Sequence, residues 1–352
     1  MGNDNFFEIE QYSLKKEVKQ KLLFDRLLLL HKLHLNSSAD YRHISEQLFP
    51  EPINSIADIP YLPVSVFKNH QLKSIPDSEV FKVLTSSGTT GTVPSRIFLD
   101  KNTANMQTKA LSNIMQYQLG KDRLPMILVD SISIIKDRSS YSARGAGILG
   151  MSVFGKSHFY LLDENMNVDQ TGLKVFLRKF KDQSILLFGF TFMVWQYLYE
   201  SSIEADLSKA TLIHSGGWKK MLEKSVNNNT FKKNLKDKFG MEKVFSFYGM
   251  VEQVGSVFLE CECGHLHAPN FADIIVRDPF DFSVVGNGKE GIIQVLSILP
   301  ESYPGHSLLT EDTGVIIGED DCRCGRNGKY FSVTGRMKKA ELRGCSDTFV
   351  NA

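Results

Sequence analysis

Apolar residues recur at helical spacing from residue 6 to residue 34, with lysine and glutamate residues between them. This periodicity predicts one or two amphipathic helices that end near the polar residues 36–38. Prolines then punctuate residues 49–63, and a segment of this kind cannot continue a helix. We therefore expect a helical N-terminal region, residues 1–75, that packs on the rest of the fold without contributing chemistry.

Short apolar runs alternate with helical patterns in the middle of the chain. Buried strands are expected at residues 79–84, 126–129, 184–188 and 211–214. Helices are expected at residues 102–119, 171–181 and 193–200. Such an alternation is typical of an α/β layered domain with at least one mainly parallel sheet.

The pattern changes after residue 245 to short β-like runs that are separated by turn residues. These runs lie at residues 256–260, 273–277, 291–297 and 313–318. They predict hairpins and antiparallel strand pairs. The expected fold class is therefore α/β, with a helical N-terminus and a β-rich second half.

The composition limits the size, charge and compartment of the protein. A chain of 352 residues is long enough for one large domain, or two, with a substantial core. Because 41 Lys and Arg stand against 40 Asp and Glu, no net charge draws the chain to nucleic acid or an anionic membrane. No apolar run reaches the roughly 18 residues of a membrane span, and the N-terminus lacks a signal-peptide pattern. We expect a cytoplasmic protein whose five cysteines are reduced, metal-bound or catalytic.

Hydroxyl and glycine residues crowd one short segment after the first expected strand. The segment contains Ser86, Ser87, Gly88, Thr89, Thr90 and Gly91. Glycine lets backbone amides approach an anion closely, and the hydroxyls add hydrogen-bond donors. The Walker pattern is absent, because no Gly-Lys-Ser/Thr follows. By composition alone, a triphosphate loop and a solvated polar turn are equally good interpretations.

This segment resembles the phosphate loop of the adenylate-forming superfamily, which includes acyl-CoA synthetases and luciferases. Four further motifs follow in the family's order: His214-Ser215-Gly216-Gly217, Tyr248-Gly249-Met250-Val251-Glu252, Thr310-Glu311-Asp312 and Gly335-Arg336. Where the family usually has Pro-Lys after the loop, this chain has Thr92-Val93-Pro94-Ser95-Arg96. The resemblance therefore assigns the phosphate-binding cation to Arg96.

The resemblance also implies how these residues bind ATP and Mg²⁺. The turn that passes close to the adenine is formed in the family by the positions of Ser215, Gly216 and Gly217. Tyr248 matches the tyrosine that packs on the adenine, and Gly249 follows it in the same motif. Glu252 matches the glutamate that holds Mg²⁺, a hard oxygen ligand suited to that ion. Asp312 matches the aspartate that binds the ribose hydroxyls.

A narrower resemblance links the chain to the acyl-protein synthetases of bacterial bioluminescence, through residues 59–68 and 216–220. Those ligases adenylate a long-chain fatty acid and then acylate one of their own cysteines, from which a reductase takes the acyl group. Cys345, within Gly344-Cys345-Ser346, resembles that acceptor cysteine in its position and context. The resemblance implies an acid–thiol ligase with Glu252, Arg336 and Cys345 as catalytic residues and an acyl reductase as its partner.

The C-terminal region departs from the larger superfamily. Only sixteen residues follow Arg336, so the mobile C-terminal lid domain with its catalytic lysine is expected to be absent. We expect an adenylate-forming core at residues 76–336 and a short C-terminal arm at residues 337–352. A flexible arm suits the transfer of a thioester between active sites, although Cys345 also fits a free cysteine in a frayed terminus.

The other cysteines form two Cys-x-Cys-Gly turns, which contain Cys261, Cys263, Cys322 and Cys324. Four thiolates offer a closed tetrahedral site that suits a structural Zn²⁺ ion. In a cytoplasmic protein, paired cysteines are metal ligands more often than disulfides. His265 or His267 could replace one cysteine, but their spacing also fits simple alternation on a strand.

Two other functions remain open. The first is an aryl- or acyl-CoA ligase that resembles the phenylacetate ligases. The second is a zinc-stabilised interaction protein without catalytic activity. The aromatic run at residues 188–195 fits either an acyl pocket or, more simply, the core.

Overall fold

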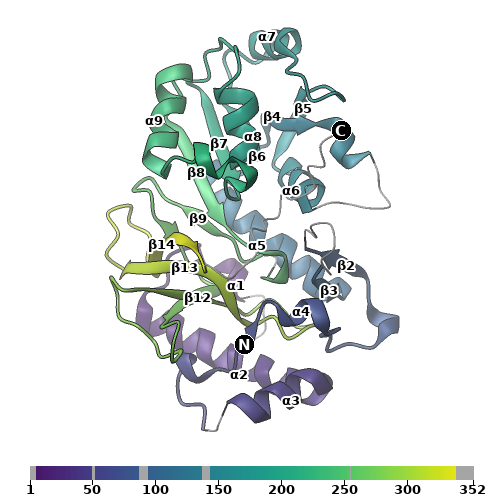
Figure 1. The fold of residues 1–352 in the computed structure, drawn as a ribbon, viewed down its shortest axis with the longest axis vertical. Coiled ribbons are helices and arrows are strands. Elements are labelled where there is room, and N and C mark those ends of the chain that lie inside the picture. Colours follow the sequence, from purple (N-terminus) through teal and green to yellow (C-terminus); the bar gives the residue numbers. More distant parts are fainter. Residues whose placement is uncertain (1–4, 50–51, 87–93, 137–142, 254, 338–352) are drawn as a thin grey trace. The chain divides into compact units, whose positions relative to one another are not determined.

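The computed structural model describes residues 5–49, 52–86, 94–136, 143–253 and 255–337 (Figure 1). This part of the chain forms two compact units. Unit 1 contains the described residues up to Ser86, residues 94–118 and the described residues from Gly249 onward, and unit 2 contains those of 119–248. No helix of the described residues is long and apolar enough to cross a membrane.

The N-terminal part of unit 1 is helical, as its apolar periodicity predicts. Its helices are α1 (Asn5–Glu8), α2 (Lys16–Ser37) and α3 (Ala39–Leu48). Helix α2 buries one stripe, formed by Lys19, Leu23, Leu27, Leu30, His31 and His34. The three- and four-residue spacing of this stripe is the pattern that packs a helix against a core.

A buried cluster of three histidines and one tyrosine attaches α2 and α3 to the rest of unit 1. His34 Nε2 donates to the carbonyl of Pro300 at 3.1 Å, and the His34 ring stacks on the His306 ring. The Tyr41 hydroxyl lies 2.8 Å from His31 Nδ1 and 3.3 Å from His306 Nε2. Burial lowers the pKa of His34 to about 3 and lowers that of His306 well below its usual range. His34 and His306 are therefore neutral at neutral pH.

The sheet of unit 1 confirms the antiparallel, β-rich second half. Its strand order is β11 (Ala272–Arg277), β12 (Glu290–Ser297), β13 (Ser307–Glu319), β14 (Lys329–Arg336), β10 (Leu266–His267) and β9 (Phe258–Glu260). Each neighbouring pair in this order is antiparallel. The short strand β1 (Leu62–Pro63) joins β13 in parallel, with Leu62 opposite Leu308 and Pro63 opposite Leu309.

The expectation of a buried strand at residues 79–84 is wrong in one respect. Strand β2 (Lys82–Thr85) exists, but it pairs antiparallel with β3 (Arg96–Leu99) in a separate two-stranded sheet. A two-stranded sheet leaves one face to solvent, so Phe81 is 63% exposed and Val83 43% exposed. Helix α5 (Lys101–Leu119) follows, close to its predicted bounds.

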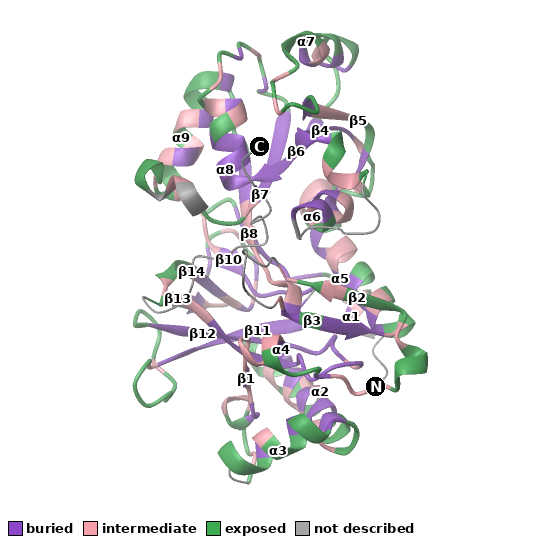
Figure 2. Cartoon of the chain, turned by 45° about the vertical axis from the view of Figure 1, so that its right-hand side comes forward, coloured by how far each residue is buried: buried purple, intermediate pink, exposed green. Residues whose placement is uncertain are grey.

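Unit 2 contains the parallel sheet that the alternating pattern predicts. Its strand order is β8 (Lys243–Tyr248), β7 (Ala210–Ser215), β6 (Ile185–Phe190), β4 (Leu124–Ser131) and β5 (Gly155–Leu162), all parallel. Its helices are α6 (Ala143–Ser152), α7 (Gln170–Lys179), α8 (Thr191–Met193) with a following π-helical turn Val194–Tyr199, and α9 (Asn228–Phe239). Figure 2 shows strand β6 almost entirely buried.

The aromatic run at residues 188–195 packs in the core of unit 2. Phe188, Phe190, Phe192 and Trp195 are each at most 6% exposed. The Trp195 ring stacks on Phe231 of α9, with centroids 5.9 Å apart. This packing agrees with the simpler of the two interpretations of the run, that it forms core.

Candidate active site and cysteine–histidine cluster

The motifs expected to bind adenine lie at the carboxyl edge of the parallel sheet in unit 2. Strand β7 ends at Ser215 and β8 ends at Tyr248, and these two strands are neighbours. The Ser215 hydroxyl donates to the carbonyl of Phe247 at 3.1 Å. Gly216 has a φ of 82°, which favours glycine, and a Cβ at Gly217 would meet no atom within 4 Å. Open α/β sheets bind their ligands at this edge.

A threonine that the sequence did not single out fixes the end of β7. The Thr191 hydroxyl donates to the carbonyl of Ser215 at 3.2 Å and lies 2.9 Å from His214 Nδ1. Burial lowers the pKa of His214 to about 3, with a further lowering by Lys232. Thr191 and a neutral His214 thus hold the backbone just before the glycine turn. No sequence signal marks Thr191, which sits inside an aromatic run.

A buried ion pair lies at the end of β4 on the same edge. Arg144 Nε of α6 lies 3.2 Å from Asp130 Oδ2, and both side chains are at most 7% exposed. Burial raises the pKa of Asp130 to about 6, while the Arg144 charge and the backbone amide of Ser131 oppose the rise. In the sequence, the only sign of this ion pair is a charged residue, Asp130, at the end of an apolar run.

The ribose and hinge motifs come together in unit 1. Strands β13 and β14 pair so that Asp312 lies opposite Arg336. Arg336 Nε is 3.8 Å from Asp312 Oδ1, and an Arg336 terminal nitrogen donates to Glu311 Oε2 at 2.7 Å. The structure therefore brings these two predicted residues to one end of a hairpin, where a carboxylate and a guanidinium lie side by side.

Glu252 is held in a 3₁₀ turn, Val251–Gln253, of unit 1. Its backbone carbonyl accepts a hydrogen bond from the Tyr303 hydroxyl at 3.0 Å, and its side chain is largely buried. Burial raises the pKa of the Glu252 carboxyl; Lys68 opposes this, and Glu311 adds to it. Lys68 is a charged neighbour that the sequence did not predict, although it lies in the 59–68 segment.

The base of the phosphate segment is a hairpin in unit 1. The Ser86 amide donates to the carbonyl of Ser95 at 3.1 Å, and the Ser95 amide donates to the Ser86 hydroxyl at 2.9 Å. Arg96 lies opposite Thr85 at the start of β3 and is exposed. The predicted residues Ser87, Gly88, Thr89, Thr90 and Gly91, and the predicted acceptor Cys345, lie outside the described residues.

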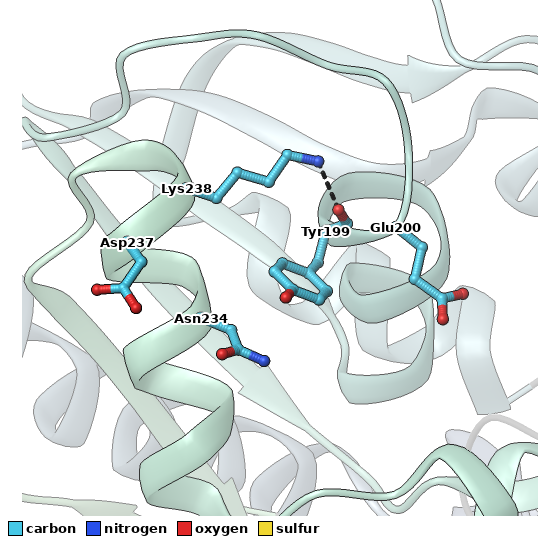
Figure 3. A pocket seen from close by; sticks show the side chains of 5 residues that line it. All are labelled: Tyr199, Glu200, Asn234, Asp237 and Lys238. Atoms are coloured by element: carbon cyan, nitrogen blue, oxygen red, sulfur yellow. Dashed lines mark hydrogen bonds between the residues drawn. The ribbon is translucent and has the colours of Figure 1, made fainter.

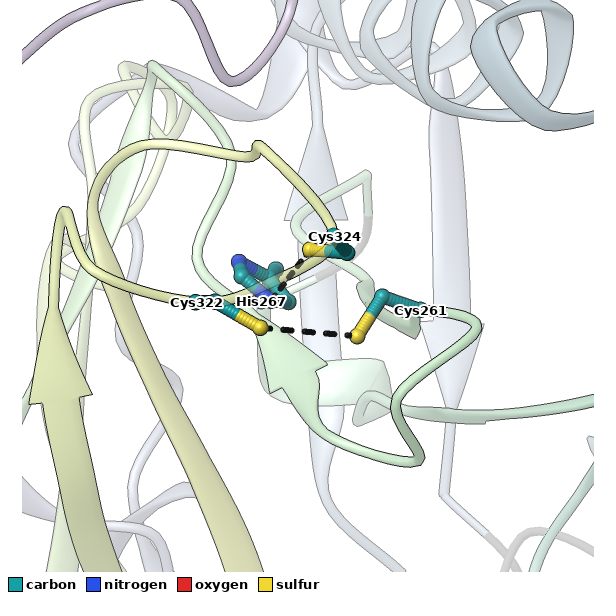
Figure 4. Close-up of side chains that lie close together, drawn as sticks. All are labelled: Cys261, His267, Cys322 and Cys324. Carbon is teal, nitrogen blue, oxygen red and sulfur yellow. Dashed lines mark hydrogen bonds between the residues drawn. The ribbon is translucent and has the colours of Figure 1, made fainter.

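Three of the four paired cysteines converge with a histidine in unit 1 (Figure 4). The ligand atoms of Cys261, His267, Cys322 and Cys324 all lie within 4.8 Å of one another. Cys263 is exposed and is not among these four, although the sequence placed it there. We call these four residues the Cys/His cluster.

The hollow drawn in Figure 3 lies on unit 2 and contains none of the predicted site residues. It is a shallow depression that Tyr199, Glu200, Asn234, Asp237 and Lys238 line. Lys238 Nζ donates to the carbonyls of Tyr199 and Ser201 at 2.5 and 2.6 Å. Its charged nitrogen is thus already used within the fold, and we assign no ligand to this depression.

Comparison with known proteins settles the family. A family model for LuxE acyl-protein synthetases matches residues 2–352. The chain belongs to the LuxE family. The resemblance to the acyl-protein synthetases of bioluminescence is therefore confirmed. Membership of the LuxE family makes this chain a ligase.

Curated relatives and solved structures agree with this assignment. The chain is similar to a long-chain-fatty-acid–luciferin-component ligase of Aliivibrio fischeri, with 23% identity over 96% of this chain and 89% of the relative. The corresponding ligase of Vibrio harveyi is 24% identical over the same shares. Among solved structures, an open 2-hydroxyisobutyryl-CoA ligase with 2-HIB-AMP and CoA has a TM-score of 0.69. It is 17% identical, and the match covers 93% of this chain and 77% of that one. The fold of the LuxE-family chain is thus that of the adenylate-forming ligases.

Proposed function

We propose that the protein converts a long-chain fatty acid and ATP into an acyl adenylate, and then transfers the acyl group to its own Cys345. The observation that carries the proposal is the placement of the Ser215–Gly217 turn and Tyr248 at adjacent strand ends, at the ligand-binding edge of a parallel sheet. The LuxE family supplies the reaction class.

In the first step, a carboxylate oxygen of the fatty acid attacks the α-phosphorus of ATP, and pyrophosphate leaves. Negative charge concentrates on the phosphoryl oxygens, so catalysis needs positioned cations and amides rather than a covalent nucleophile. Glu252 would hold the Mg²⁺ ion, which would offset the negative charge of the triphosphate, and Arg96 with the segment 86–91 would bind the phosphates themselves. Asp312 binds the ribose hydroxyls, and Arg336 holds Asp312 in place.

In the second step, the Cys345 thiolate attacks the acyl carbonyl, the thioester forms and AMP leaves with its phosphate oxygen. A thioester keeps the acyl group activated for reduction, so the partner that receives it is an acyl reductase in the cytoplasm. ATP and Mg²⁺ are the cosubstrate and cofactor of the first step. A structural Zn²⁺ ion on cysteines of the two Cys-x-Cys-Gly turns, Cys261, Cys322 and Cys324 among them, completes the proposal.

The proposal is tested by pyrophosphate release from the full-length protein with ATP, Mg²⁺ and a series of saturated carboxylic acids. We expect release that requires an acid and increases toward long chains, and hydroxylamine should trap the acyl group as a hydroxamate. Addition of CoA should leave the rate unchanged. Acyl-CoA formation would instead identify the acceptor as CoA, and no release with any acid would favour a non-catalytic protein.

A further inference from the structure

We propose that Cys261, His267, Cys322 and Cys324 bind one Zn²⁺ ion, with the imidazole of His267 as the fourth ligand in place of Cys263. The assignment gives a ligand set to the structural zinc of the proposed function. It does not depend on acyl transfer, because metal content is measured without substrates.

Two distances within the Cys/His cluster are close to those of a tetrahedral zinc site. With Zn–S bonds of about 2.3 Å and a Zn–N bond of about 2.05 Å, tetrahedral angles place two sulfurs about 3.8 Å apart and a sulfur about 3.6 Å from the nitrogen. The sulfurs of Cys261 and Cys322 are 3.9 Å apart, and the Cys324 sulfur is 3.4 Å from His267 Nε2 (Figure 4). Two pairs of ligand atoms are therefore already at the separation that one zinc ion requires, and the other pairs lie within 4.8 Å.

The two turns that present the sulfurs have the same construction. The amide of Gly264 donates to the carbonyl of Cys261 at 2.9 Å, and that of Gly325 donates to Cys322 at 3.0 Å. Both glycines have a φ near 80°, at 81° and 82°, where a residue with a Cβ would be strained. Two matched tight turns thus place Cys261 and Cys322 face to face.

The fourth position is filled by a strand residue rather than a turn residue. His267 lies on β10 between β9 and β14, is fully buried, and stacks on the Tyr330 ring with centroids 5.5 Å apart. This packing fixes the ring with Nε2 toward the sulfur of Cys324. His265 Nδ1 lies 3.7 Å from the Cys322 sulfur, but His265 is not one of the four residues whose ligand atoms are mutually close.

A buried arginine follows the cluster in the sequence, two residues after Cys324. The Arg326 side chain is 1% exposed, and its ion-pair partner Glu262 is 4.0 Å away and 62% exposed. A buried guanidinium with so distant a counter-charge is costly. Three thiolates, one neutral imidazole and Zn²⁺ sum to a charge of about −1 beside it. The closer partners of Arg326 are neutral, since it donates to Gln118 Oε1 at 2.6 Å and lies over the Tyr12 ring, so the negative charge of a zinc centre would complement it.

The position of the zinc suggests what it does for the enzyme. Cys322 and Cys324 lie in the turn that joins β13 to β14. His267 lies on β10, and Cys261 lies in the turn that leads from β9 to β10. The ion therefore fastens the hairpin at its turn, while Asp312 and Arg336 pair at the opposite end of the same hairpin. Zinc acts as a structural clamp, because four protein ligands leave no open position for substrate.

X-ray absorption on the untagged wild-type protein, purified under reducing conditions without chelator, tests the ligand set directly. We expect one zinc per chain, with three sulfurs at about 2.3 Å and one nitrogen at about 2.0–2.1 Å. Cys263→Ser and His265→Gln, the matched controls from the same turn, should retain full zinc content. Cys322→Ser should reduce zinc affinity by more than about tenfold.

Several outcomes overturn the proposal. A shell of four sulfurs would restore Cys263 as a ligand, as would loss of zinc from Cys263→Ser to the same extent as from Cys322→Ser. Iron in place of zinc, or a wild-type protein that takes up no zinc, would contradict the metal assignment. Because the absorption measurement uses the wild-type chain, it decides the question even if a cysteine variant does not fold. A protein that binds zinc but releases no pyrophosphate would keep this inference and reject the acyl-transfer proposal.

Discussion

Replacing Glu252 with glutamine is expected to lower the rate of acyl-adenylate formation by about 10²–10³-fold, the usual cost of removing one electrostatic contact to a transition state. The amide keeps the shape of the side chain but loses the charge that binds Mg²⁺. The fold should tolerate the change, since burial already raises the pKa of the Glu252 carboxyl and a neutral group avoids that desolvation cost. Pyrophosphate release at several Mg²⁺ concentrations measures the effect.

The matched control for this prediction is Glu46→Gln. Glu46 is an exposed carboxylate on α3, remote in sequence from every predicted site residue. We expect it to leave the rate unchanged, and we expect the urea unfolding midpoint of Glu252→Gln to equal or exceed that of the wild type. A Glu252→Gln protein with the wild-type rate at saturating Mg²⁺ would remove Glu252 from the site.

Acid is expected to destabilise unit 1 more than unit 2. His34 and His306 in unit 1 and His214 in unit 2 are buried, and burial lowers the pKa of His34 and His214 to about 3 and that of His306 well below its usual range. In the unfolded chain these groups titrate near 6.5, so below that pH the unfolded state binds more protons. Stability is therefore complete above about pH 6.5 and is lost as the pH falls.

The size of this loss of stability follows from the lowered pKa values of the buried histidines. Between pH 7.5 and pH 5.0 a histidine with a folded pKa of about 3 should cost about 2 kcal/mol of unfolding free energy, and unit 1 should lose more than this because burial lowers the pKa of His306 as well. In unit 2, burial raises the pKa of Asp130 to about 6, so the folded carboxyl gains its proton first. That gain should return about 1 kcal/mol by pH 5.0 and offset part of the cost of His214.

The two units can be followed separately during urea unfolding. Both tryptophans, Trp195 and Trp218, belong to unit 2, so their fluorescence reports unit 2 while far-ultraviolet circular dichroism reports both units. At pH 5.0 we expect the circular dichroism transition to begin at lower urea than the fluorescence transition. His34→Gln should reduce the pH dependence, and His43→Gln, at an exposed position on α3, should not. Equal shifts of both transitions would contradict the assignment.

The sequence predicted what depends on local pattern. Alternating apolar runs located β4, β6 and β7, and the change of pattern after residue 245 located the antiparallel strands. The expected burial of residues 79–84 was wrong: β2 pairs with β3 alone, outside the large sheet, and it is β3 that is buried. An apolar run does not show which sheet a strand joins.

Contacts between segments that are distant in the sequence were the part of the site that was harder to predict. The Cys-x-Cys-Gly turns were evident, but the choice of His267 over Cys263 depends on β10 pairing with β14, some sixty residues further along the chain. The pairs Asp130–Arg144 and Thr191–His214 likewise form only when parallel strands and their following helices assemble. Family motifs, by contrast, offered Tyr248, Glu252 and Asp312 as candidates directly, since each lies in a short stretch of characteristic sequence.

Intact-protein mass spectrometry after incubation with ATP, Mg²⁺ and a long-chain fatty acid tests self-acylation most directly. The wild-type chain should gain the mass of the acid less one water, and hydroxylamine should remove it, as a thioester requires. Cys345→Ser should show no adduct while still releasing pyrophosphate, and Cys263→Ser should be acylated like the wild type. A wild-type protein that releases pyrophosphate but never carries an acyl group, or a Cys345→Ser protein that still carries one as a thioester, would contradict acyl transfer to Cys345.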